Sequence, residues 1–214
     1  MTKKLSFLAF HGLVVCLASS ATWAQQEQAG LFDSVSVYAG QGVHHKLQEV
    51  PEQLFSGNLR WDKTYLAGVA LGKTRGELGH NFPSLQGGWF EQVSHGYEVV
   101  LNQHHGMQSL AELGAIYRLR TPDLELGPIT VNFSAGTGFS YTFGTPSYEF
   151  PTKKGPHEKH RTLLMSRFEL EWGLAGAPDT RLITLLHHRS GLFETIAPRG
   201  YDSNFIAIGL RHRF

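Results

Sequence analysis

The chain has 214 residues, a formal net charge of +1 and a single cysteine. A charge so close to zero does not indicate a nucleic-acid partner, and one cysteine excludes an internal disulfide. The 24 glycines and the 12% share of aromatic residues fit a β-rich chain with aromatic girdles.

Residues 1–24 are predicted to be a signal peptide. Lys3 and Lys4 begin this segment, a mostly apolar run follows over residues 5–18, and small residues lead to a cleavage site after Ala24. The apolar run is too short to span a membrane. Cys16 lies inside it without the small preceding residues of a lipidated cysteine, so no lipoprotein is expected.

After the signal peptide, period-two segments alternate with turn-forming clusters, and little of the chain has a helical period. No apolar run of about 18 residues or more remains, which excludes helical membrane spans. We therefore predict one all-β domain over residues 25–214, a transmembrane antiparallel β-barrel. Eight strands are expected, at residues 32–40, 59–72, 88–103, 108–120, 128–143, 161–173, 180–190 and 202–214. A turn at Asp62-Lys63-Thr64 would divide the second strand, so nine or ten strands remain open.

Connection lengths orient the barrel, because bacterial barrels have short periplasmic turns and longer outer loops. The connections at 41–57, 144–160 and 191–201 are long, and those at 121–127 and 174–179 are short. This pattern predicts both chain ends in the periplasm and the protein in the bacterial outer membrane. Two connections depart from it: residues 73–86 are longer than expected, and the connection near His104-His105-Gly106 is shorter.

The last strand shows which face meets lipid. Its residues alternate so that Ile206, Ile208 and Leu210 share one face with Asp202 and Asn204. The opposite phase contains Arg211 and Arg213. The first face is expected to point to lipid and the second into the polar barrel interior.

His188 and Ser190 are the candidate catalytic residues. Two residues apart on a strand, they leave it on the same face. A neutral imidazole beside a hydroxyl can take its proton and make the oxygen nucleophilic towards an ester carbonyl, while a third group orients the imidazole. Alone, the pattern recurs by chance in proteins of this length, and it more often reflects a histidine at the barrel rim and a serine that starts a turn before Gly191.

The chain resembles the PagL family of outer-membrane lipid A 3-O-deacylases. The family has a His-x-Ser motif at the end of its seventh strand and an acidic residue near the start of the eighth, matched here by His188 and Ser190. Weaker similarity lies at Trp61-Asp62-Lys63 and over residues 135–139. The resemblance implies an eight-stranded barrel with a Ser-His-Glu type triad on its lipid-facing side.

The third triad member and the oxyanion donors depart from the family pattern. The family spacing of twelve residues after the serine reaches Asp202, where the family has Glu, whereas alignment from the C-terminus reaches Asn204. Glu194, in the loop, is a further candidate, and we favour Asp202. The family has Asn after the serine, but this chain has Gly191, so the backbone N–H groups of Gly191 or Leu192 are the predicted oxyanion donors.

Arginines are the candidate residues for phosphate binding, and histidines are the candidates for metal binding. Arg189 and Arg199, expected at the outer rim, are candidates for the phosphates of lipid A. Twelve histidines include the pairs His44-His45, His104-His105 and His187-His188. Adjacent residues on a strand point to opposite faces, so such a pair does not easily chelate one ion. No metal site is predicted.

We therefore predict an esterase that uses Ser190, His188 and Asp202 to hydrolyse an ester-linked 3-hydroxyacyl chain of lipid A without a cofactor. Its partner is lipid A, or lipopolysaccharide, in the outer leaflet, and a homodimer is compatible with the sequence. The alternative is a non-catalytic barrel with a structural, adhesive or small-channel role. Acyl transfer between lipids would need an acceptor site that the sequence does not reveal.

Overall fold

The computed structural model describes residues 30–149, 160–192, 195–197 and 200–214. Residues 32–213 form one compact unit, which contains all the strands. The predicted signal peptide, residues 1–24, lies outside the described residues.

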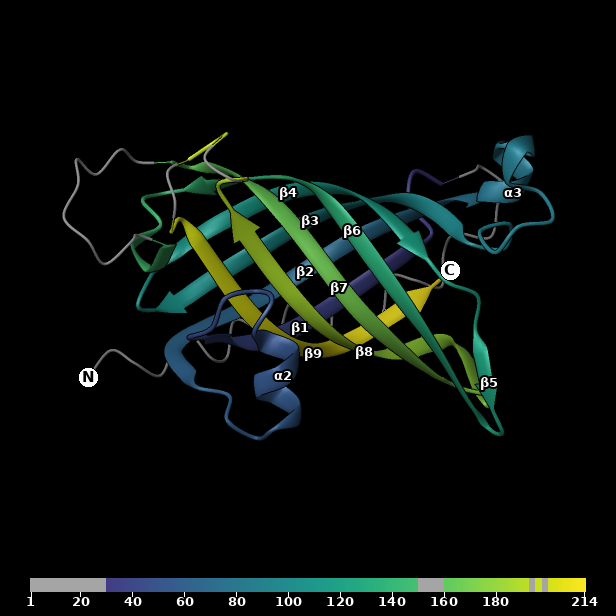
Figure 1. Cartoon of the computed structure of the whole chain (residues 1–214), viewed down its shortest axis with the longest axis horizontal. Helices are drawn as coiled ribbons and strands as arrows, with labels where there is room; N and C mark the ends of the chain where they lie inside the picture. The colour runs from purple at the N-terminus through teal and green to yellow at the C-terminus, as the bar shows by residue number, and fades with distance from the viewer. Residues whose placement is uncertain (1–29, 150–159, 193–194, 198–199) are drawn as a thin grey trace. The chain divides into compact units, whose positions relative to one another are not determined.

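The unit is a closed antiparallel β-barrel of eight strands (Figure 1). Each strand pairs with its neighbours along the chain, the first pairs with the last, and the ring is completed between β4 and β6. The barrel strands are β1 (Ser34–Val43), β2 (Trp61–Glu77), β3 (Ser94–Gly106), β4 (Leu110–Arg120), β6 (Ile129–Phe143), β7 (Thr162–Leu174), β8 (Ala177–Ser190) and β9 (Asp202–Arg213).

Five short elements belong to the connections. The small strand β5 (Leu124–Leu126) pairs only with the start of β6, so it extends a hairpin and is not part of the barrel wall. The others are α2 (Val50–Phe55), α3 (Leu78–Asn81), η2 (Pro83–Leu85) and η3 (Ser147–Glu149). No helix in the described part of the chain has the length and apolar character needed to cross a membrane.

The predicted eight-stranded barrel is confirmed, and the alternative of nine or ten wall strands is not. Asp62-Lys63-Thr64 lies inside β2 and is no turn. The largest difference concerns the next connection. β2 continues to Glu77 and β3 begins only at Ser94, so the connection covers residues 78–93 and contains α3 and η2.

The barrel rims follow from the connections. Ser34 pairs with Arg213, so β1 begins and β9 ends at the same rim, and the two-residue turn between β7 and β8 lies there too. Following the rule of short periplasmic turns, we call this end the periplasmic rim and the opposite end, where β8 finishes, the outer rim. Figure 1 shows α3 and the β5 hairpin at the periplasmic end of the strands.

Outward and inward residues alternate as predicted. On β9, Ile208 and Leu210 are 57% and 51% exposed, whereas Arg211 is fully buried. An apolar exterior around a charged interior is the organisation of an outer-membrane barrel. Arg211 faces inward as expected, and Arg213, which binds the buried Glu171, does so as well.

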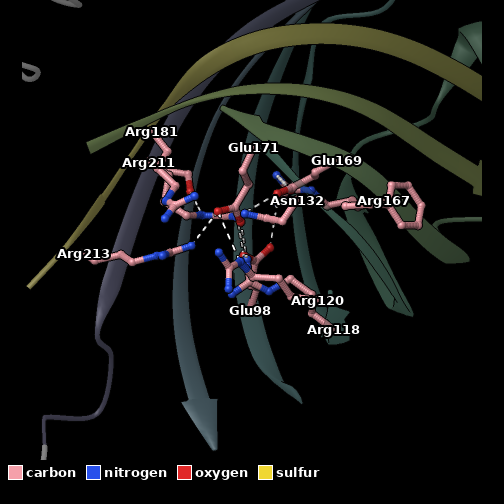
Figure 2. A network of polar contacts seen from close by, with 12 residues as sticks. Glu98, Arg118, Arg120, Asn132, Arg167, Glu169, Glu171, Arg181, Arg211 and Arg213 are labelled. Carbon is pink, nitrogen blue, oxygen red and sulfur yellow. Dashed lines mark hydrogen bonds and ion pairs between the residues drawn. The ribbon is translucent and has the colours of Figure 1, made fainter. Parts of the chain in front are cut away.

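Side chains fill the interior in layers. Near the periplasmic rim, Glu98, Glu169 and Glu171 form ion pairs with arginines of the three strands β4, β7 and β9 (Figure 2). Arg211, for example, lies 2.6 Å from Glu98 and 2.9 Å from Glu169. The middle layer is apolar and consists of Leu66, Ala70, Val100, Ile116, Met165, Ile183, Leu185, Phe205 and Ala207, with Tyr38. In the layer near the periplasmic rim, losing one partner of a buried ion pair costs about 3–5 kcal/mol. The ion pairs of that layer therefore specify the strand arrangement strongly.

Candidate active site

His188 and Ser190 lie at the outer end of β8 and belong to its outward-facing phase. Their inward-facing neighbours His187 and Arg189 are completely buried. Across the seam to β9, His188 is paired with Asn204 and Ser190 with Asp202. The four candidate residues therefore occupy two adjacent cross-strand pairs on one face of the sheet.

The imidazole of His188 is held by Asn204. Its Nδ1 lies 2.8 Å from Asn204 Oδ1, and Asn204 Nδ2 donates to the His45 carbonyl oxygen at 2.8 Å. Because the second bond fixes the amide with its oxygen towards the imidazole, His188 donates through Nδ1–H. Nε2 therefore keeps its lone pair, which is the state a general base requires.

Asp202, the favoured third member, is not the residue bound to His188. Its cross-strand partner is Ser190, one pair further towards the outer rim. The hydrogen-bond partner is instead Asn204, the alternative reached by alignment from the C-terminus. The third candidate, Glu194, lies outside the described residues.

Ser190 is half-buried and close to His188 in sequence, but no described residue is hydrogen-bonded to its hydroxyl. Catalytic hydrogen bonds are often long in a ligand-free enzyme and tighten when substrate binds. A second outward serine, Ser166 on β7, is the cross-strand partner of His188 on its other side. Ser166 could not be recognised from the sequence, because only strand register brings it next to the imidazole.

The two predicted oxyanion donors differ in the structure. Gly191 N–H already donates to the Tyr201 carbonyl at 3.0 Å, so the expectation that it serves an oxyanion is not supported. Leu192 has a φ of 51°, the left-handed conformation that side chains rarely adopt. Its N–H donates to no described backbone carbonyl, while its C=O accepts from Thr195 N–H at 2.9 Å. Leu192 is therefore the remaining donor of the pair.

The prediction that Arg189 binds phosphate at the outer rim is wrong. Its side chain is completely buried inside the barrel, bound to Glu149, Glu112 and the Ser140 hydroxyl. The reason is the period of two, because a residue between the outward-facing His188 and Ser190 must point inward. Arg199, the other candidate, lies outside the described residues.

A buried polar cluster underlies the site. Glu112 lies 2.9 Å from His104, 3.2 Å from His187 and 3.2 Å from Arg189. His187 and Arg189 flank His188 along β8, so these contacts anchor the backbone from which His188 projects. No sequence pattern marks Glu112, which lies on β4, three strands round the ring from β8.

The short helical turn η3, in the connection that follows β6, closes the outer mouth of the barrel from within. Tyr148 packs on Phe205 with ring centroids 5.6 Å apart and donates to Asp62 at 2.6 Å. Burial and the Asp62 carboxylate raise the pKa of the Tyr148 phenol, which therefore stays a donor. Glu149 is fully buried and bridges Arg189 and the Ser203 hydroxyl. Side chains thus occupy the mouth of the barrel.

The connection between β1 and β2 covers the outward site. His188 and Asn204 face outward, yet they are only 7% and 2% exposed. The His45 carbonyl that binds Asn204 belongs to this connection, and Val50 at the start of α2 is buried. Residues 44–60 therefore contribute to the cover over His188.

The histidines make no metal centre among the described residues, where no group of three or more His, Cys, Asp or Glu side chains is arranged to hold an ion. His44 and His45 contact Asp62 and Glu49 separately, at 3.5 and 3.8 Å.

Solved structures share this fold. The crystal structure of the outer membrane enzyme PagL matches with a TM-score of 0.51 and 11% identity, over 85% of this chain and 99% of that chain. Neisserial surface protein A gives a TM-score of 0.48 at 10% identity, over 88% and 100% of the two chains. LpxR from Salmonella typhimurium gives 0.33 at 14%, over 87% and 69%. No protein-family model and no curated protein matches the chain. At 11% identity, the similarity to PagL concerns the fold alone.

Proposed function

We propose that this barrel is an outer-membrane esterase that hydrolyses an ester-linked 3-hydroxyacyl chain of lipid A. The observation that carries the proposal is the oriented pair His188–Asn204 on the outward face, two residues from Ser190. The resemblance of the His188-x-Ser190 segment to the lipid A 3-O-deacylases supplies the substrate class.

Each residue then has a defined role. His188 Nε2 takes the proton of the Ser190 hydroxyl as its oxygen attacks the ester carbonyl, and Leu192 N–H stabilises the developing oxyanion. The protonated imidazole gives its proton to the departing sugar oxygen, which leaves an acyl-serine. Water, deprotonated by His188, then hydrolyses that ester and releases a 3-hydroxy fatty acid and free Ser190. No cofactor takes part.

Asn204 replaces the family carboxylate as the group that orients the imidazole. An amide oxygen can hold the Nδ1–H tautomer, as in proteases with a Cys-His-Asn arrangement. The neutral amide cannot balance the positive charge of the imidazolium. We assign this charge stabilisation to Asp202, the first residue of β9, which is on the same face of the strand. Both the favoured and the alternative candidate thereby take part.

An outward-facing site suits a lipid substrate. The acyl chains of lipid A already lie in the outer leaflet, beside the outward face of β8 and β9. A soluble enzyme would have to extract them from the membrane at the cost of exposing apolar surface to water. Here the ester linkage, near the outer rim, reaches Ser190 by lateral movement in the membrane.

The second candidate is a non-catalytic structural barrel, and one observation favours it: His188 and Asn204 are nearly inaccessible. In that case the His188–Asn204–His45 chain of hydrogen bonds fastens residues 44–60 to the barrel wall. A small-channel role has less support, because buried side chains fill both the interior layers and the outer mouth.

Mass spectrometry of lipid A separates the two candidates. The chain is expressed in an outer membrane, and lipid A is compared for the wild type, Ser190→Ala, His188→Ala and the matched control Ser166→Ala. The esterase predicts loss of one hydroxyacyl chain in the wild type and the control but not in the two site variants. Residual activity on the order of 10⁴-fold or more below wild type is expected for each of them.

Heat-dependent mobility in electrophoresis establishes that every variant is folded. Unchanged lipid A from a correctly folded wild-type barrel would eliminate the esterase. If Ser166→Ala is inactive while Ser190→Ala is active, the nucleophile is on β7 and the assignment of Ser190 is wrong.

A further inference from the structure

The long connection between β2 and β3 has no role in the candidate site, and it lies at the opposite, periplasmic rim. Its backbone is closed by hydrogen bonds from Leu78 N–H to Val93 O at 2.9 Å and from Gly79 N–H to Glu91 O at 3.0 Å. A Cβ on Gly79 would approach the Glu91 Cγ to 2.5 Å, so the two sides of the connection lie in close contact. Residues 78–93 therefore form a structured extension of the β2–β3 hairpin.

This extension exposes large aromatic side chains. Trp89 is 87% exposed, Phe90 51% and Phe82 48%. Trp89 and Phe90 pack edge to face with their centroids 5.6 Å apart. So much aromatic surface is unfavourable in water and indicates a covering partner.

The extension is continuous with the lipid-facing wall. Phe82 packs on His95 at 6.2 Å, and His95 packs on Tyr117 at 5.8 Å, with a hydrogen bond of 2.6 Å from its Nδ1 to the Tyr117 hydroxyl oxygen. His95 and Tyr117 belong to the outward phases of β3 and β4, which continue towards the outer rim through Val99, Leu101 and Leu113. The aromatic cluster thus begins where the apolar belt ends.

Cationic groups lie beside the aromatic ones. Lys73 on β2 is the cross-strand partner of Tyr97, and the Arg75 guanidinium lies over the Tyr97 ring, 5.2 Å from its centroid. Aromatic rings and long basic side chains together are typical of the membrane interface, where the rings enter the boundary of the acyl chains and the cations meet phosphate.

We propose that residues 78–93 form a foot that inserts Phe82, Trp89 and Phe90 into the periplasmic leaflet, with Lys73 and Arg75 contacting the phosphates of its phospholipids. The foot sets the depth and tilt of the barrel in the membrane, because interfacial aromatic and basic anchors determine both. It is independent of the esterase and holds equally for a non-catalytic barrel.

Trp89 itself reports on the proposal. The barrel without residues 1–24 is refolded in phospholipid vesicles as Trp61→Phe/Trp172→Phe, which leaves Trp89 as its tryptophan. We expect blue-shifted emission, strong quenching by phosphatidylcholine brominated near the top of its acyl chains and little quenching by acrylamide in the water. Emission at the wavelength of water-exposed tryptophan, quenched by acrylamide and not by bromolipid, would overturn the proposal. The partner that covers the foot would then be a periplasmic protein.

Two variants in the same background sharpen the test. Phe82→Ser/Phe90→Ser should reduce the bromolipid quenching of Trp89 and shift its emission to longer wavelength. Phe55→Ser removes a side chain that is 89% exposed on α2, at the other rim, and should change neither. An equal effect of both variants, with heat-dependent mobility retained, contradicts a local contact between foot and leaflet.

Discussion

The last four residues of β8 divide between two environments. His187 and Arg189 point into the barrel, where buried carboxylates surround them. His188 and Ser190 point outward, and among the described side chains Asn204 is hydrogen-bonded to His188. Ion pairs fix the inward pair, whereas the outward pair, beneath residues 44–60, carries the imidazole and the hydroxyl of the candidate site. One short segment thus combines rigid positioning with outward-facing functional groups, which is what a site built on a strand requires.

The inward side should determine stability. Arg189→Ala leaves the buried Glu112 and Glu149 without their guanidinium, which should lower the free energy of unfolding by about 3–5 kcal/mol. Urea unfolding of the barrel in vesicles measures the loss. Ser190→Ala, one residue away, should stay within about 0.5 kcal/mol of the wild type. Equal losses in both variants would contradict the division of β8 into two environments.

The outward side should determine rate. Asn204→Ala removes the group that orients the imidazole, and deacylation should fall on the order of 10²-fold. Asp202→Asn keeps the shape of the side chain and removes only its charge, for which a drop of about tenfold or less is expected. Mass spectrometry of lipid A over time gives both rates. If Asp202→Asn is the more damaging substitution, Asp202 is the orienting residue in the active enzyme.

The smallest effect lies at the periplasmic rim, in the turn after β4. Burial acts to raise the pKa of Asp123, but hydrogen bonds from Arg181 and the charge of Arg120 outweigh it, and the pKa lies below its usual range. A lowered carboxyl pKa stabilises the fold above the unfolded-state value, and this contribution is lost as pH falls through the folded-state value.

Asp123→Asn should therefore unfold at lower urea concentration than the wild type at neutral pH. The difference should disappear in acid, and the exposed Asp179→Asn is the matched control. A difference that persists unchanged at low pH would show that the carboxylate charge is not what Arg181 recognises.

Strand positions and faces could be predicted from the sequence because both depend on a period of two. The same period also predicts that the Arg189 side chain points inward, because its neighbours His188 and Ser190 point outward. The choice between Asp202 and Asn204 could not be made in this way. The two share a face, and only the strand register across the β8–β9 loop brings Asn204, not Asp202, next to His188.

Other features depend on contacts between distant parts of the chain. Glu112 reaches His187 and Arg189 across the barrel interior, and Glu149 enters the mouth from a loop with no periodic pattern. The sequence predicts a connection at residues 73–86 that is too long for the periplasmic side, and the structure places the extension at residues 78–93. Its aromatic residues carry no strand or helix period, so their position against His95 and Tyr117 required the fold.

The hydrogen bond from Asn204 to the His45 carbonyl joins residues 159 positions apart in the chain. It crosses the seam where β9 meets β1, the last pairing available to a chain that is made from its N-terminus. Until that seam forms, the Asn204 amide lacks the bond to His45 that turns its oxygen towards the imidazole. Under the proposed function, the enzyme becomes active only when its cylinder closes, so lipid hydrolysis is confined to fully assembled molecules.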